Sequence, residues 1–110
     1  MSGTRRATAK RLTNARLAEL AARHGTPLLV IDCETIRRQY RSLSGALPGV
    51  GLFYALKPLP NPEVVATLRA LGAGFDVATT GEIELVRSQH VAPGRCIHTH
   101  PIKRDADIDA

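Results

Sequence analysis

The amino-acid sequence predicts an α/β protein built from parallel strand–helix–strand units. Apolar runs suited to strands begin about every 22 residues along the 110-residue chain, and the segments between them show helical spacing and helix caps. The runs are continuously apolar rather than alternating, which is typical of parallel strands covered on both faces. Such units build either an open doubly wound sheet or a (β/α)8 barrel. No GxGxxG or GxxxxGKS/T motif follows any run, so we favour the barrel, with about its first four units in this chain.

The first predicted unit contains a helix, a strand and a second helix. Residues 12–24 place leucines among charges and end at Gly25, as in a short amphipathic helix. The apolar run 28–31 predicts the first strand, and Asp32 is suited to cap the helix after it. That helix carries one apolar stripe at spacings of four, three and four, formed by Ile36, Tyr40, Leu43 and Leu47.

Three further strands are predicted at residues 51–57, 74–78 and 95–98. The helix after the first of them has the clearest boundaries, because it starts at Asn61-Pro62 and is followed by Gly72. The next helix starts with the T-x-x-E capping box of Thr79 and Glu82. Residues 105–110 look like a helix start without a helix body, so we expect the chain to be a piece of something longer.

The formal net charge of +5 is concentrated at the N-terminus. Residues 1–23 hold six basic residues and one acidic residue, whereas residues 24–110 carry nine charges of each sign. We therefore expect a basic tail with a short helix over residues 1–25 and the barrel portion over residues 26–110. A basic arm can bind nucleic acid, but no aromatic residues lie among the charges, so nucleic acid is not an expected partner. The basic residues are Arg5, Arg6, Lys10, Arg11, Arg16 and Arg23.

The composition indicates a soluble, cytoplasmic protein. No run of about 18 apolar residues is present, and the N-terminus lacks the apolar core of a secretory signal, so no membrane contact is expected. Cys33 and Cys96 lie far apart and match no zinc or redox spacing, so we expect reduced thiols.

Polar residues lie at or near the carboxyl ends of three successive predicted strands: Lys57, Asp76, and the pair His98 and His100. In parallel α/β folds the chemistry gathers at the carboxyl ends of the strands, so these residues are expected to converge. The chain has three lysines against twelve arginines, and a lysine, unlike an arginine, can form an imine with an aldehyde. Lys57 is therefore a candidate for covalent chemistry.

Each of these residues also has a purely structural interpretation. Lys57 can simply extend to solvent from a strand end, Asp76 can cap the following helix, and Glu82 can serve only the capping box. His98 and His100 point to the same face and can share a metal ion, but no third ligand lies at a useful spacing. We therefore favour a pocket wall or a loop histidine over a metal site.

Three motifs in order and at the right spacing make the chain, from about residue 26 onward, similar to one enzyme family. The sequence resembles the N-terminal part of the fold-type III pyridoxal-phosphate decarboxylases, the ornithine/diaminopimelate/arginine decarboxylase group. The resemblance implies an alanine-racemase-like (β/α)8 barrel, pyridoxal 5'-phosphate as cofactor, and ornithine, lysine, arginine or diaminopimelate as the small-molecule substrate. The motifs are Tyr54-Ala55-Leu56-Lys57 with Pro60-Asn61-Pro62, then residues 71–78, LGAGFDVA, and residues 81–86, GEIELV.

The resemblance also assigns roles to single residues. In that family the lysine of the Y-A-x-K motif holds the cofactor as a Schiff base, which places this role on Lys57. Ala55 is implied to lie beside the cofactor ring, with Asp76 and Glu82 near the active site. The substrate amine would displace Lys57, carbon dioxide would leave while the ring takes up the electrons, and Lys57 would then carry a proton. His100 is implied as a further cofactor-site residue, but it stands where the family often has the asparagine of an A-N-P-x-K sequence.

Several parts of the family pattern differ or are missing. The common K-A-N-x-N sequence is here Lys57-Pro58-Leu59-Pro60-Asn61. The phosphate loop, the acid partner of the pyridine nitrogen, the histidine on the ring and the C-terminal β-domain would all lie beyond Ala110. We therefore expect this chain alone to be inactive and the full-length protein to be a homodimer.

Two other functions are compatible with the motifs. An amino-acid racemase of the same fold also uses a lysine of the barrel, but the F-D-V-A-x-x-G-E-I segment favours the decarboxylases. A non-catalytic homologue that binds a partner, as antizyme inhibitors do, is the other alternative. Retention of Lys57 argues against it.

Overall fold

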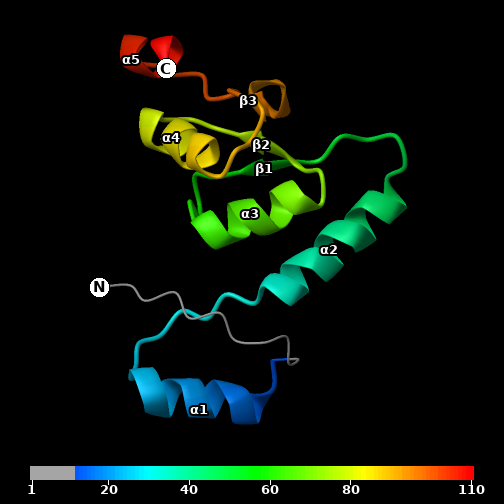
Figure 1. Ribbon diagram of the computed structural model, residues 1–110, viewed down its shortest axis with the longest axis vertical. Coiled ribbons are helices and arrows are strands. Elements are labelled where there is room, and N and C mark those ends of the chain that lie inside the picture. Colours follow the sequence, from blue (N-terminus) through cyan, green and yellow to red (C-terminus); the bar gives the residue numbers. More distant parts are fainter. Residues whose placement is uncertain (1–11) are drawn as a thin grey trace.

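A computed structural model describes residues 12–110, so Arg5, Arg6, Lys10 and Arg11 lie outside the described residues. The described residues form one parallel sheet of three strands in the order β1-β2-β3 (Figure 1). The strands are β1 (Phe53–Ala55), β2 (Gly74–Asp76) and β3 (Cys96–Ile97). The helices are α1 (Asn14–His24), α2 (Cys33–Ala46), α3 (Pro62–Ala70), α4 (Thr80–Ser88) and α5 (Asp105–Asp109), with a short 3-10 helix, η1 (Pro93–Arg95), before β3.

The strands are joined by helices in the way that the sequence predicts. Helix α3 connects β1 to β2 and α4 connects β2 to β3, which gives two parallel βαβ units. The register pairs Ala55 with Asp76 and Asp76 with Ile97. The α/β architecture with a parallel sheet is therefore confirmed, and these carboxyl ends lie side by side.

The predicted first strand, residues 28–31, is wrong. These residues form no strand, and Leu29 is 77% exposed. The segment runs between α1 and α2, away from the sheet (Figure 1). Apolar side chains give a segment the propensity for a strand, but a strand also needs a neighbour that pairs with its backbone groups, and residues 12–110 provide none here. The described part of the chain thus holds three of the four predicted strands.

One face of the sheet carries the hydrophobic core. Leu56 and Phe75 are fully buried and pack against Val64 and Val65 of α3 and against Val86 of α4. Burial of such side chains contributes about 1.5–3 kcal/mol each to folding. The same face therefore fixes the positions of both helices.

The opposite face of the sheet is uncovered by the residues that the structure describes, contrary to the expectation of strands covered on both sides. Phe53 is 47% exposed, and Ile97 is also exposed. Phe53 lies directly over Gly74, its partner in the register, and a Cβ atom at residue 74 would collide with the phenyl ring. Glycine is therefore required at residue 74 by this close packing.

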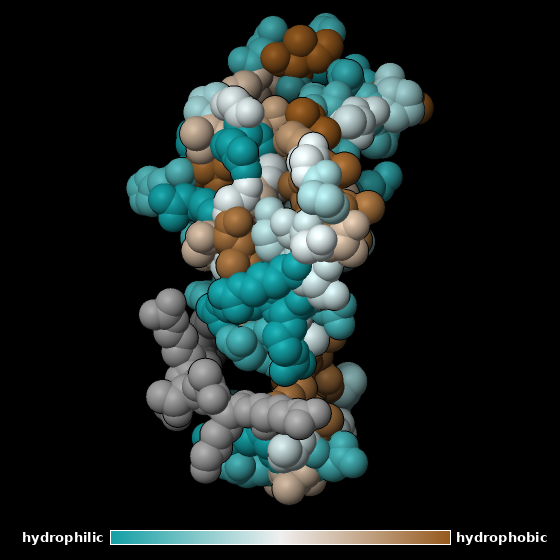
Figure 2. Space-filling model, turned by 90° about the vertical axis from the view of Figure 1, so that its right-hand side faces the viewer, coloured by the Kyte–Doolittle hydropathy of each residue, from teal (hydrophilic) through white to brown (hydrophobic). Residues whose placement is uncertain are grey.

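Helix α2 lies beside α3 and uses only half of its predicted apolar stripe. Ile36 and Tyr40 pack against the core, whereas Leu43 and Leu47 are exposed. Figure 2 shows a hydrophilic band at the level of α2, below the hydrophobic residues at the level of the sheet. No helix of residues 12–110 is both long enough and apolar enough to cross a membrane.

The predicted caps at Asp32 and Asn61 are confirmed. The Asp32 carboxylate accepts a hydrogen bond from the amide of Glu34 at 3.1 Å, and the Asn61 side chain accepts from the amides of Glu63 and Val64 at 2.9 and 3.2 Å. These acceptors satisfy amides that have no partner within the first turn of a helix. The cap at Asn61 fixes the start of α3, the helix that follows β1.

Candidate active site

A hollow of about 230 Å³ lies at the carboxyl ends of the three strands. Small-molecule pockets enclose roughly 300–1,000 Å³, so this hollow corresponds to one side of such a pocket. The residues that line it come from the ends of β1 and β2 and from the segments that follow the three strands. They are Ala55, Lys57, Asp76, Ala78, Thr99, His100 and Pro101.

Lys57 reaches the hollow from a turn directly after β1. The amide of Leu59 donates to the carbonyl of Leu56 at 3.0 Å, which leaves Lys57 and Pro58 at the corner of the turn. Leu56 is fully buried, and the hydroxyl of Tyr54 donates to the carbonyl of Leu59 at 2.9 Å. The turn is thus anchored on both sides of Lys57, and its side chain lines the hollow instead of the core.

The amine of Lys57 has no partner among the described residues. The side chain is exposed, and no hydrogen bond or ion pair joins it to residues 12–110. An amine that is not held in an ion pair is available to attack a carbonyl carbon once it has lost its proton. Two observations thus make Lys57 a candidate for covalent chemistry: its position at a strand end, which the sequence predicts, and its amine without a partner among residues 12–110.

Asp76 fixes the end of β3 rather than capping α4. Its carboxylate accepts hydrogen bonds from the Thr99 amide at 3.2 Å and from the Thr99 hydroxyl at 2.6 Å. Helix α4 is capped by Thr79 instead, so the capping interpretation of Asp76 is wrong. Asp76 lies beside Ile97 in the register, and Thr99 follows Ile97 by two residues. This places Thr99 within reach of the carboxylate, although the sequence analysis gave Thr99 no role.

Glu82 does not line the hollow. Its amide donates to the Thr79 hydroxyl at 3.2 Å, as the predicted capping box requires. Its carboxylate accepts at 2.5 Å from the amide of Ala78, one residue before the N-cap, instead of from Thr79. Glu82 is buried and holds Ala78, which does line the hollow.

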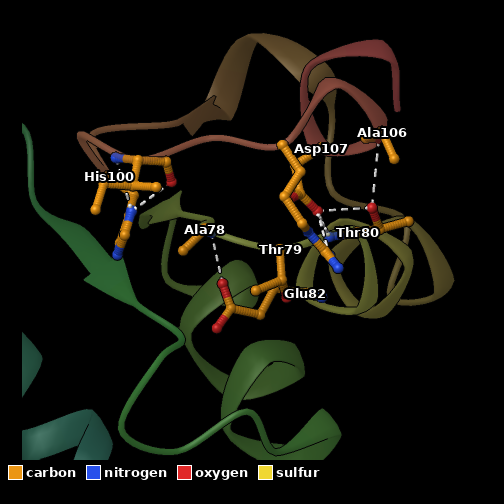
Figure 3. Close-up of polar contacts among 9 residues, drawn as sticks. Ala78, Thr79, Thr80, Glu82, His100, Ala106 and Asp107 are labelled. Carbon is orange, nitrogen blue, oxygen red and sulfur yellow. Dashed lines mark hydrogen bonds and ion pairs between the residues drawn. The ribbon is translucent and has the colours of Figure 1, made fainter.

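The ring of His100 has a defined orientation at the edge of the hollow. Its Nδ1 lies 2.7 Å from the carbonyl oxygen of Ile102 and 3.2 Å from the Ile102 amide nitrogen. Both contacts involve the same ring nitrogen, so they fix the orientation of the ring and leave Nε2 on its opposite side. Figure 3 shows the far end of the ring directed toward β1, the strand that precedes Lys57.

His98 does not line the hollow, so the two histidines do not act together there. The Nε2 atom of His98 is buried without a hydrogen-bond partner in the part of the chain that the structure describes. Among residues 12–110, no group of three or more histidine, cysteine, aspartate or glutamate side chains comes together as a metal site would require.

Comparison with known proteins identifies the family to which this arrangement belongs. The sequence profile described as "Pyridoxal-dependent decarboxylase, pyridoxal binding domain" matches residues 33–110. The chain belongs to this family of pyridoxal-dependent decarboxylases. The matched range includes all the residues that line the hollow, and the resemblance inferred from the motifs is confirmed.

Individual pyridoxal-dependent decarboxylases match most of this chain. The lysine/ornithine decarboxylase of Selenomonas ruminantium is 37% identical over 93 residues, which are 84% of this chain and 24% of that protein. The solved structure of the lysine/ornithine decarboxylase of Vibrio vulnificus complexed with cadaverine has a TM-score of 0.80 and 60% identity, over 84% of this chain and 25% of that chain.

A relative with a different name also matches. Antizyme inhibitor 2 of Xenopus laevis is 45% identical over 79 residues, or 72% of this chain and 17% of that protein. The chain spans about a quarter or less of the length of these three relatives.

Proposed function

We propose that this chain forms the lysine-bearing part of a pyridoxal-phosphate-dependent amino-acid decarboxylase, with Lys57 as the residue that binds the cofactor covalently. The observation that supports this most directly is the amine of Lys57, which has no partner among residues 12–110 and lines a hollow at three strand ends. All the residues that line the hollow lie within the range that matches the pyridoxal binding domain. Pyridoxal phosphate carries an aldehyde, and a primary amine is the side-chain group that attacks such a carbon.

The residues present fit the aldehyde end and one face of the cofactor. Ala55 and Ala78 have small side chains, and they leave space beside Lys57. The hollow is smaller than a complete small-molecule pocket, so the phosphate and the far face of the ring need further groups. We therefore propose that residues 12–110 supply one wall and that the chain alone is inactive.

Lys57 has two roles in this proposal. Pyridoxal phosphate, when bound, supplies an electron-withdrawing ring that accepts the electron pair left by the departing carbon dioxide. Lys57 would hold the cofactor through its Nζ atom, with the aldehyde oxygen leaving as water. Once the substrate amine had taken its place, the freed amine of Lys57 would hand a proton to the substrate carbon that had lost its carboxylate.

The other predicted site residues position the ligand. We propose that Ala55 lies against the ring and that Asp76, held by two donors from Thr99, presents its remaining acceptor sites to the hollow. Glu82 acts through Ala78, whose amide it binds. His100, whose Nδ1 contacts Ile102, presents Nε2 to the ligand for a hydrogen bond.

Basic amino acids are the proposed substrates. The relatives from Selenomonas ruminantium and Vibrio vulnificus are named lysine/ornithine decarboxylases, and these names favour lysine or ornithine. We also propose that the complete protein is a homodimer, as the family resemblance implies. A cytoplasmic location is proposed because Cys33 and Cys96 are unpaired thiols, as in a reducing compartment. A non-catalytic, antizyme-inhibitor-like function is the second candidate because of the match to Antizyme inhibitor 2.

Chemical trapping tests the role of Lys57. The complete protein is incubated with pyridoxal phosphate, reduced with borohydride and digested, and the modified lysine is found by mass spectrometry. We expect the cofactor mass on Lys57 and not on Lys103, an exposed lysine that serves as an internal control. The Lys57→Arg variant should lose the modification, whereas Lys103→Arg should retain it. Equal modification of both lysines would contradict the proposal.

Product analysis separates the candidate functions. The complete protein should release carbon dioxide and a diamine from lysine or ornithine, with a Lys57→Ala variant as the control. Inversion of the substrate without loss of carbon dioxide would indicate a racemase. Absence of any turnover by a protein that still binds a partner would favour the second candidate. Turnover by the 110-residue chain alone would contradict the proposal that it is inactive.

A further inference from the structure

Two connections beside the hollow are joined at both ends by side-chain hydrogen bonds, which are called ties below. The first runs from β2 into α4, and the second runs from β3 to α5. At one end Asp76 binds Thr99, and at the other end Asp107 binds Thr80. Thr80 and Asp107 lie 27 residues apart in the sequence, so this second tie joins distant parts of the chain.

The tie at Asp107 is made by a buried and fully paired carboxylate. Asp107 is 6% exposed. Its Oδ1 accepts from the amide and from the hydroxyl of Thr80, both at 2.8 Å, and its two oxygens accept from Nε and Nη2 of Arg104 at 2.8 and 3.0 Å. Figure 3 shows Thr80 and Asp107 facing each other at the start of α4. The bidentate pair with Arg104 lies within the first turn of α5 and fixes the orientation of the carboxylate. The bonds from Thr80 join α5 to the start of α4.

Capping of α4 alone does not account for this arrangement. The N-cap of α4 is Thr79, whose hydroxyl accepts from the amide of Glu82. The side chain of Glu82 in turn holds the residue before the cap. Asp107 adds a second acceptor at Thr80, the first residue of the helix, and brings a different segment of the chain to it.

The residues between the two ties form much of the wall of the hollow. Ala78 lies between Asp76 and Thr80, and His100 and Pro101 lie between Thr99 and Asp107. We propose that Asp107 is a positioning residue of the site, which acts through Thr80 to hold His100 and Pro101 at the edge of the hollow. This inference rests on the proposed function, because it takes the hollow to be the cofactor site.

Matched variants of the complete protein test the proposal. Asp107→Asn removes the negative charge that strengthens the bonds from Thr80 and Arg104, and Thr80→Val removes the hydroxyl while the backbone amide stays. Thr80→Ser retains the hydroxyl, and Asp109→Asn changes an exposed aspartate of the same helix. Circular dichroism and thermal unfolding first establish that each variant is folded. If Asp107→Asn does not fold, Thr80→Val alone is used to test the proposal.

Two measurements are then compared. We expect amide hydrogen exchange over residues 99–103 to become about tenfold faster in Asp107→Asn and Thr80→Val, because the tie at one end of the segment is weakened. The Kd for pyridoxal phosphate, measured by equilibrium dialysis, should rise several-fold in the same variants, while Lys57 is still modified at saturation. Thr80→Ser and Asp109→Asn should behave like the unchanged protein.

The possible outcomes separate the two proposals. If exchange accelerates only within α4 and α5 and the Kd is unchanged, Asp107 is a helix cap and the positioning role is overturned. If the unchanged protein does not bind pyridoxal phosphate at Lys57, the proposed function fails. Hydrogen exchange over residues 99–103 still decides in that case whether the tie exists, and unaltered exchange overturns it.

Discussion

Gly72 and His90 occupy equivalent positions after two successive helices, and both have a left-handed backbone, with φ of 86° and 59°. In each case this residue donates its amide to the carbonyl three residues back, and the next residue donates to the carbonyl five residues back. Both turns are Schellman motifs, in which glycine is the usual residue. His90 therefore adopts a backbone conformation that is energetically unfavourable for a residue with a side chain.

His90→Gly is expected to stabilise the protein. A residue other than glycine pays about 1 kcal/mol for the left-handed conformation, so the free energy of unfolding should rise by about that amount. The Arg69 side chain donates to the His90 carbonyl at 3.2 Å, and this backbone contact remains in the variant. Urea denaturation provides the measurement. Gly72→Ala is the matched change in the opposite direction, and a loss of stability in His90→Gly would contradict this account of the turn.

Gly74→Ala is expected to destabilise the sheet by about 1–3 kcal/mol, because the new Cβ atom would displace the ring of Phe53. The same substitution should cost much less in a Phe53→Ala background. A double-mutant cycle measured by urea denaturation should therefore give a coupling energy above about 0.5 kcal/mol. Additive effects of the two changes would show that the ring does not set the requirement for glycine.

Thr99→Val is expected to impair the site more than the fold. It removes the hydroxyl that donates to Asp76 at 2.6 Å and keeps the backbone amide. Because Thr99 is exposed, the change in unfolding free energy should stay below about 1 kcal/mol. We expect kcat/KM of the complete protein to fall about tenfold, as a loss of about 1.4 kcal/mol would produce. Thr99→Ser should retain activity, and equal loss in both variants would contradict a role for the hydroxyl.

Acid is expected to destabilise the protein through two aspartates. The pKa of Asp107 lies far below its usual value because Arg104 and Thr80 donate hydrogen bonds to it, and the pKa of Asp32 is lowered mainly by the Thr35 hydroxyl at 2.6 Å. A lowered folded-state pKa means that the stabilisation is present above the unfolded pKa of about 3.9 and is lost as the pH falls below it.

Urea midpoints measured between pH 7 and pH 2.5 check this expectation. In the unchanged protein, the contribution of these two aspartates to stability should be nearly constant above about pH 5 and should decrease below about pH 4. Asp107→Asn should be less stable at neutral pH and should show a smaller decline in acid. An unchanged decline in that variant would show that Asp107 does not contribute to it.

The convergence of Lys57, Asp76 and His100 was predictable because each lies at or just after the end of a strand of one parallel sheet. Once the strands are parallel, their carboxyl ends meet at one edge whatever the details of packing. The caps at Asp32 and Asn61 were predictable for a similar reason, since a cap depends only on residues within one turn.

Other features depend on contacts that no local pattern contains. The tie between Thr80 and Asp107 joins residues far apart in sequence, and the bond from Glu82 to Ala78 differs by one residue from the standard capping box. The run 28–31 has the side chains of a strand but no backbone partner among residues 12–110. The contact between Thr99 and Asp76 could have been inferred only from the strand register, because Thr99 lies two residues after Ile97, the partner of Asp76.

The turn at Lys57 and the wall that faces it are built on different parts of the chain. The turn depends on Leu56 and Tyr54 of the β1 segment, whereas His100 stands on the connection after β3 and is held through Thr99 and Asp107. In the proposed function, substitutions at residue 100 are therefore expected to change which molecules the site admits while the amine of Lys57 stays in place. Substrate range and covalent binding of the cofactor would then be separable by substitution.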